Sequence, residues 1–371
     1  MPDEGADGLL KAMERGTALL WTAAPAEATA AWGEGAVWLA AHRDRPVISG
    51  RGGLEHLGSL VLNDRALPYD GEVAERILLR VHMALARLLV GDDRGARIEL
   101  RVADRIRTEE GERLGADLDH PLVHVLSGWL YETRGRADEA RIDYRRALAV
   151  DGSLAIARDG LERTRDGRSG SHPPTVLLVA AVGRAPVKFE ERLNIPTHHG
   201  AVSWTVPAYR SHPDRISAVR VLVDGRPAAT GEVVLDVDAW MRESLRGRLF
   251  WMAARSAARA AAKAELVERA EKKWGTAGAV LGSILAMESE SADLRSWLTL
   301  PRSFVVARVE IPPGEHEIGA EVLGLGGRPL ATATAGRLAI EAGDRVVLAC
   351  RAVGPALSLV TSGHPAPEIQ P

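Results

Sequence analysis

Apolar residues recur at intervals of three and four positions through the first 167 residues of the chain. Segments of this kind are LLKAMERGTALLWTA (9–23), AEATAAWGEGAVWLAAH (26–42) and, more strongly, GEVAERILLRVHMALARLLVGDD (71–93). In the strongest segment five residues share one side of a helix: Leu78, Val81, Leu85, Leu88 and Leu89. This periodicity predicts amphipathic helices that bury one face in a common core.

The pattern changes after DGRSGSHPP (166–174), a polar stretch that is rich in Gly and Pro and has no periodicity. Beyond it, short apolar runs rich in β-branched residues predict strands. The main strand-like ranges are 175–182, 201–209, 217–235 and 303–353. Within the third range, Asp224 and Gly225 predict a tight hairpin turn.

A helical pattern interrupts these strands. An Ala-rich segment (238–275) ends at Gly275, and a second helical segment follows it to Leu298. The sequence therefore predicts an α+β fold with two domains. A tetratricopeptide-like helical domain (1–167) precedes a β-sandwich-like domain (175–360), which a long Ala-rich helical hairpin interrupts at 238–298.

An internal repeat supports the tetratricopeptide comparison. GRADEARIDYRRA (135–147) echoes GDDRGARIELRVA (91–103) at an offset of 44 residues, with Gly, Ala and Arg-Ile at matching places. The residues expected to pack the second unit are Gly128 and Tyr131 on its first helix and Ala140, Tyr144 and Ala147 on its second. Small residues allow two antiparallel helices to approach, and Ala140, Tyr144 and Ala147 share one helical face. Two ordinary hairpins that are alike by chance are the alternative. A repeat of this kind predicts a short solenoid whose concave face binds peptides or partner proteins.

Composition narrows the class of protein. With 371 residues, 46% of them hydrophobic and 26% charged, the chain has enough material for two domains and a sizeable core. A net charge of -3 gives no bulk electrostatic sign of nucleic-acid binding. The single cysteine, Cys350, lies in a strand-like run, and we expect it to be a buried small hydrophobe. We find neither a signal-peptide pattern at the amino terminus nor an apolar segment of the roughly 20 residues that a membrane span needs.

The sequence shows no convincing catalytic chemistry, and we expect a protein that is not an enzyme and needs no cofactor or metal. His120 and His124 stand four residues apart, a spacing that allows a shared metal ion, but a third ligand is not evident. Helix capping or core packing is the simpler interpretation. His198 and His199 form a pair in a predicted loop, and neighbouring side chains of an extended segment point apart.

A basic stripe lies on the Ala-rich helix. Arg255, Arg259 and Lys263 follow one another at four-residue spacing and are the residues we expect to contact a partner. A solvated helix face with internal salt bridges is the plainer interpretation, and a polyanion site is a further one. Aromatic residues do not interleave with the stripe as a single-strand binder would need, so we expect no nucleic-acid partner.

The order of several segments along nearly the whole chain resembles a family of uncharacterised bacterial envelope lipoproteins with tetratricopeptide-like amino-terminal halves. These segments are MERGTALLWTA (13–23), the stretch from NDRALPYDG to ARIEL (63–100), PVKFEERLNIP (186–196), RSAARAAAKAE (255–265) and SADLRSWLTLPRSFVVARVEIPPGEH (291–316). The resemblance implies exported proteins associated with lipoprotein activators of penicillin-binding proteins. It implies no enzymatic activity.

The resulting hypothesis is a non-catalytic scaffold or adaptor that binds protein partners in the cell envelope, such as cell-wall synthesis machinery. By the resemblance its location is the periplasm or envelope, with a membrane contact only through a lipid anchor. Since the chain shows neither signal peptide nor lipobox, the cytoplasm is the alternative.

A second hypothesis places a cell-wall glycan-binding module or a hydrolase in the β domain. Its candidate residues are His198, His199 and Glu190 for hydrolysis, and Trp204, Trp240 and Trp251 for a glycan platform. An oligomeric structural role, with Ala-rich helices packed between protomers, is a third alternative.

Overall fold

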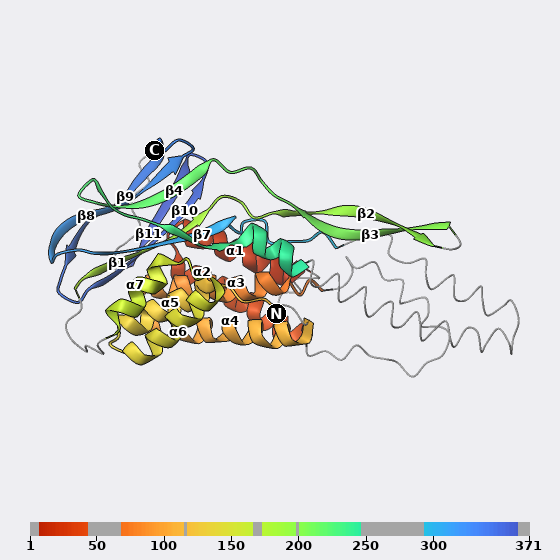
Figure 1. The fold of residues 1–371 in the computed structure, drawn as a ribbon, viewed down its shortest axis with the longest axis horizontal. Helices are drawn as coiled ribbons and strands as arrows, with labels where there is room; N and C mark the ends of the chain where they lie inside the picture. The colour runs from red at the N-terminus through yellow and green to blue at the C-terminus, as the bar shows by residue number, and fades with distance from the viewer. Residues whose placement is uncertain are drawn as a thin grey trace, which may run out of the picture.

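The computed structural model describes residues 7–43, 68–114, 117–165, 173–197, 200–245 and 293–362. The fold is α+β, as the sequence predicts, with helices in the amino-terminal part and sheets after them (Figure 1). The labelled helices are α1 (Gly8–Trp21), α2 (Pro25–Arg43), α3 (Val73–Leu89), α4 (Asp93–Leu114), α5 (Pro121–Glu132), α6 (Ala137–Val150) and α7 (Ala155–Arg163). Residues 237–245 are also helical, at the start of the predicted Ala-rich insertion, and residues 246–292 of that insertion lie outside the described residues.

Consecutive helices pack as hairpins, α1 with α2, α3 with α4 and α5 with α6. The repeated glycines of the sequence, Gly91 and Gly135, follow α3 and α5 and have φ angles of 77° and 69°. A left-handed residue after a helix ends it without the steric penalty that a Cβ atom would bring. Each glycine therefore turns the chain from the first helix of a hairpin into the second.

The strands form two larger sheets and a two-stranded ribbon. They are β1 (Thr175–Val182), β2 (Val187–Thr197), β3 (Gly200–Arg210), β4 (Ile216–Val223), β5 (Arg226–Thr230), β6 (Glu232–Asp236), β7 (Ser303–Glu310), β8 (Gly314–Gly324), β9 (Pro329–Ile340), β10 (Arg345–Val353) and β11 (Ala356–Thr361). The five-stranded sheet has the order β11-β10-β1-β7-β6, and the four-stranded sheet has the order β5-β4-β8-β9. The ribbon β2–β3 projects from the body (Figure 1). The predicted turn joins β4 to β5, with φ angles of 52° at Asp224 and 72° at Gly225.

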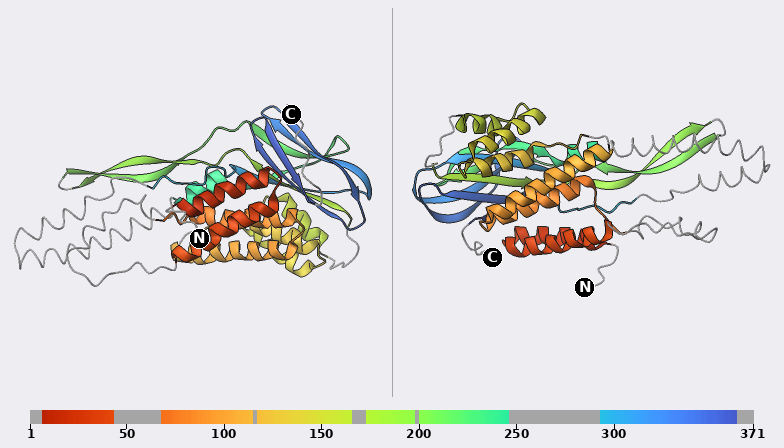
Figure 2. Two further views of the ribbon diagram at one scale, coloured as in Figure 1. Left: turned by 180° about the vertical axis from the view of Figure 1, so that it is seen from behind. Right: turned by 90° about the horizontal axis from the view of Figure 1, so that it is seen from below.

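The five-stranded sheet is the central layer, because its middle strand β1 is buried on both faces. Leu177, Val179 and Ala181 of β1 pack toward the helices. Val176, Leu178 and Ala180 pack into a second core shared with the four-stranded sheet. The described residues before and after 166–174 therefore share one hydrophobic core. Figure 2 shows the helices gathered on one face of the sheets.

The helices themselves form two layers. Nearly every residue of α3 and α5 is buried, and these helices contact β10 and β6 respectively. In α6 only three residues are buried, and α4 is buried along one side. In the hairpins α3–α4 and α5–α6, the first helix thus lies between the sheet and the second helix. The second helices, α4 and α6, form the outer surface.

The structure differs from the prediction at three places. The strands β2 and β11 were not predicted. Residues 293–298 are not helical, although a helix was predicted as far as Leu298. The backbone N–H of Trp297 donates to the Glu75 carboxylate (2.7 Å) and that of Leu298 to the Glu14 carboxylate (2.7 Å), so these groups are not available for helical hydrogen bonds.

Candidate functional site

The residues predicted to pack the repeat lie together inside the helical layer. Tyr144 is 1% exposed, and Ala140 and Ala147 are fully buried beside it on α6. The Tyr144 ring packs between two glycines, Gly128 on α5 and Gly160 on α7, where a Cβ atom would lie 2.7 Å and 2.5 Å from ring atoms. These contacts fix the position of α6 against its neighbours.

The buried Glu132 carboxylate lies beside Tyr144 and links the three helices around it. The Tyr144 hydroxyl donates to the Glu132 carboxylate (2.6 Å), which also pairs with Arg163 (2.7 Å) and with Arg308 of β7 (3.5 Å). Burial alone would raise the pKa of Glu132, but these arginines and the hydroxyl outweigh it and lower that pKa. A buried carboxylate thus ties α5, α6 and α7 to the sheet.

The inner face of the helical stack is covered. In a solenoid of such hairpins the first helices line the concave face, and here α3 and α5 pack against the five-stranded sheet. The expected partner-binding concavity of this domain is therefore occupied by the chain's own sheet. The exposed surface of the stack is the outer one, formed by α4 and α6.

A groove runs along this outer surface between α4 and α6, with α5 at its floor. Its cavity has a volume of about 200 Å³. The side chains that line it are Arg97, Leu100, Arg101 and Asp104 of α4, Val123, His124, Ser127 and Tyr131 of α5, and Glu139, Ile142, Asp143 and Arg146 of α6. We call it the α4–α6 groove. Of the residues expected to pack the repeat, only Tyr131 contributes to its lining.

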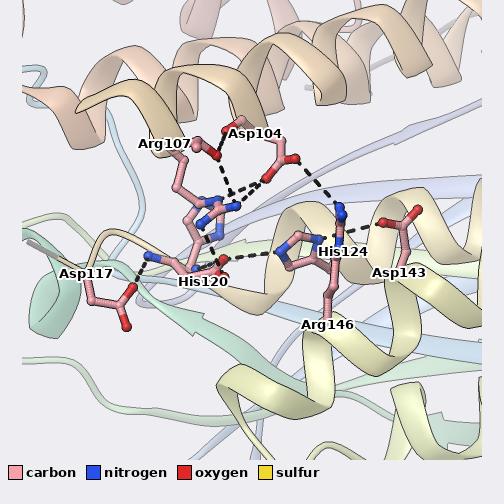
Figure 3. Close-up of polar contacts among 9 residues, drawn as sticks. Asp104, Arg107, Asp117, His120, His124, Asp143 and Arg146 are labelled. Atoms are coloured by element: carbon pink, nitrogen blue, oxygen red, sulfur yellow. Dashed lines mark hydrogen bonds and ion pairs between the residues drawn. The ribbon is translucent and has the colours of Figure 1, made fainter. Parts of the chain in front are cut away.

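His124 of α5 lies in the groove between two carboxylates (Figure 3). Its Nε2 lies 3.1 Å from Asp119, and its Nδ1 lies 3.8 Å from Asp143 of α6. Burial would lower the pKa of His124, but the two carboxylates outweigh it, so that pKa is raised above 6.5. Asp104 accepts hydrogen bonds from Arg107 (2.7 and 3.0 Å) and pairs with Arg146 across the groove (3.7 Å).

His120 and His124 do not form a metal site. Both ring nitrogens of His124 face carboxylates, and the His120 ring packs edge-on against Trp240, with the ring centroids 4.6 Å apart. Burial lowers the pKa of His120 to about 3, so its ring is neutral. Within the described part of the chain, no three His, Cys, Asp or Glu side chains gather as metal ligands.

The arginines of α4 form a stripe that was not predicted from the sequence. Arg94, Arg97, Arg101 and Arg105 are spaced by three, four and four residues, which places them on one side of the helix. Arg101 donates to the Tyr131 hydroxyl (3.1 Å) at the rim of the groove. The stripe could have been found from the spacing of the arginines in the segment DDRGARIELRVADRIR (92–107).

A second groove lies between α6 and α7. Its cavity is about 490 Å³, and it is lined by Asp138, Arg141, Ile142, Arg145, Leu161 and Arg165. Ile142 lines both grooves and is 50% exposed, so an apolar side chain stands at the centre of an arginine-rich surface. Large apolar side chains at this exposure are candidates for contact with a partner.

The other predicted site residues fall elsewhere. Arg255, Arg259 and Lys263 lie outside the described residues, as do His198, His199 and Trp251, while the side chain of Trp204 is likewise not described. Glu190 is exposed on β2, and Trp240 is buried against His120 instead of forming an open platform. Of the residues named for hydrolysis or glycan binding, the structure therefore describes the side chains of Glu190 and Trp240, and these lie on separate elements.

No family model matches the chain, and a search of curated proteins gives no match. The resemblance to envelope lipoproteins therefore depends on the segments of the chain itself. None of the described helices combines the length and apolar character that crossing a membrane requires.

Proposed function

We propose that this protein is a non-catalytic adaptor that binds a segment of a partner protein on its outer helical surface, in the α4–α6 groove. The observation that carries the proposal is Ile142, half exposed between two grooves whose rims are rich in arginine. Apolar anchors surrounded by polar and arginine side chains are typical of the energetic centre of protein interfaces. On the resemblance to envelope lipoproteins, we propose that the partner is a protein of the bacterial cell envelope.

Rigidity of the surface supports the same proposal. The buried Tyr144 holds α6 from below, and on α4 the Glu99 carboxylate pairs with Arg80 (2.9 Å) and Arg87 (3.4 Å) of α3. A surface fixed in this way loses little conformational entropy when a partner binds. The adaptor would then present a preformed groove.

Site-specific photo-cross-linking in cells tests the proposal. Arg145 is exposed one turn from Ile142 on α6, at the adjoining α6–α7 groove, so a probe there reaches a partner bound over Ile142 without replacing a residue of the α4–α6 groove. A photoreactive amino acid in place of Arg145 should give a protein adduct, and the same group in place of Arg226, exposed on β5, should not. Adding Ile142→Asp should abolish the adduct at position 145. Leu325→Asp is the matched control, because Leu325 is 71% exposed in a remote turn. Absence of any adduct at position 145, or an adduct that survives Ile142→Asp, contradicts the proposal.

A further inference from the structure

The arginine stripe on α4 identifies the kind of segment that the groove would bind. We infer that this segment is an acidic amphipathic helix, an inference that rests on the proposed function. Its carboxylates would face the arginines of α4, and its apolar residues would cover Ile142 and Ile98.

The arginine stripe of α4 carries positive charge that is not paired with any carboxylate that the structure describes. Among the described residues, Arg94, Arg97, Arg101 and Arg105 make no ion pair within 4 Å. The stripe spans 11 residue steps of α4, about 16 Å at the rise of an α-helix. Three turns of a partner helix have the same length, and acidic residues at three- and four-residue spacing on it would match the stripe.

The carboxylates of the groove do not cancel this charge, because each already has a cationic partner. Asp104 pairs with Arg107 and Arg146, Asp143 faces His124, and Glu139 pairs with Arg136. An acidic ligand would therefore meet arginines without first displacing an internal pair.

Apolar exposure favours a protein segment over a nucleic acid. Ile98, beside the stripe on α4, is 51% exposed, and Ile142 across the groove is 50% exposed. Single-stranded nucleic acids gain affinity from open aromatic faces. The aromatic ring of this groove, Tyr131, already has the Arg136 guanidinium over it at 5.1 Å. Charge and apolar surface together fit an amphipathic helix docked in a groove.

Fluorescence anisotropy with the full chain tests the inference. The probe is a labelled 18-residue helical peptide in which Leu and Glu alternate at helical spacing, and the control peptide carries Lys in place of Glu. The acidic peptide should bind and the lysine peptide should not. Arg97→Glu with Arg101→Glu should weaken binding at least about tenfold, since two attractions become repulsions. Ile142→Ala should weaken it several-fold, Arg226→Glu should leave it unchanged, and added salt should reduce the affinity.

The outcomes separate this inference from the proposed function. If the lysine peptide binds equally well, or if the double arginine variant binds the acidic peptide normally, the acidic class is wrong. If a single-stranded RNA oligonucleotide binds more tightly than the acidic peptide and loses affinity in the same double variant, the stripe is a polyanion site. In either case an adduct at position 145 that depends on Ile142 would still support an adaptor. Failure of both experiments removes both proposals.

Discussion

Tyr144 lies between Gly128 and Gly160, and this packing predicts an unusual effect of a small substitution. A methyl group at residue 160 would lie 2.5 Å from the Tyr144 ring, whereas unstrained carbon contacts are about 3.5–4.0 Å. The ring cannot easily move, because its hydroxyl is bonded to buried Glu132. Overpacking of this size costs about 1–3 kcal/mol, and alanine regains up to about 1 kcal/mol of helix propensity. Gly160→Ala should therefore lower the free energy of unfolding by about 1–2 kcal/mol.

The same substitution should change sign when the ring is absent. Tyr144→Ala itself should cost about 3–5 kcal/mol, but in that background Gly160→Ala should stabilise by about 0.5–1 kcal/mol. Urea unfolding followed by circular dichroism measures all four proteins. Gly33→Ala on α2 is the control, because a Cβ atom there meets nothing within 4 Å, and it should stabilise both backgrounds equally. Equal destabilisation by Gly160→Ala with and without the Tyr144 ring would refute the argument.

Three other predictions concern the buried charges and the irregular segment. Glu110→Ala breaks a buried pair with Arg76 (2.9 Å) and should lower the free energy of unfolding, measured with urea, by about 3–5 kcal/mol. The double variant Arg76→Met with Glu110→Leu should regain most of the lost stability, because it leaves no unpaired buried charge. Because the pKa of His124 is raised in the folded state, its stabilisation is complete below the unfolded value of 6.5 and is lost as the pH rises through the folded pKa. His124→Gln should remove that fall in stability, as unfolding curves between pH 5 and about pH 9 would show. Trp297→Ala empties a fully buried site and should cost about 3–5 kcal/mol, while Leu298→Ala, 58% exposed next to it, should change stability by less than about 0.5 kcal/mol in the same assay.

Local patterns predicted much of this fold. The helical periodicity, the strand at 175–182 and the Asp224-Gly225 turn are all local signals, and the structure confirms them. The arrangement of the sheets has no such signal. β1 pairs in parallel with β10, and Thr175 lies beside Arg345. Contacts over such sequence distances depend on how the faces pack. The same cause explains why residues 293–298 are not helical, since Trp297 and Leu298 bond to Glu75 and Glu14.

Only part of the candidate site could be predicted from the sequence. The spacing of the arginines on α4 and the pattern of small residues around Tyr144 can both be recognised in the sequence. The groove arises because that packing sets α6 across from α4, and this depends on Gly160 of a third helix. The sequence also could not reveal that the inner face of the helices is covered, because the strands that α3 and α5 contact, β10 and β6, lie far from these helices in the sequence.

The covering sheet has a consequence for biosynthesis. The helices α3 and α5 emerge from the ribosome early, yet the sheet that buries their inner faces includes β10 and β11, which end at Thr361. At ordinary rates of about 5–20 residues per second, roughly 200 residues of further synthesis take about 10–40 s. A nascent chain stalled at residue 165 should therefore be sensitive to protease where the released protein is protected. For that interval an apolar helical surface is open to chaperones, so the timing of translation is part of how this chain reaches its fold.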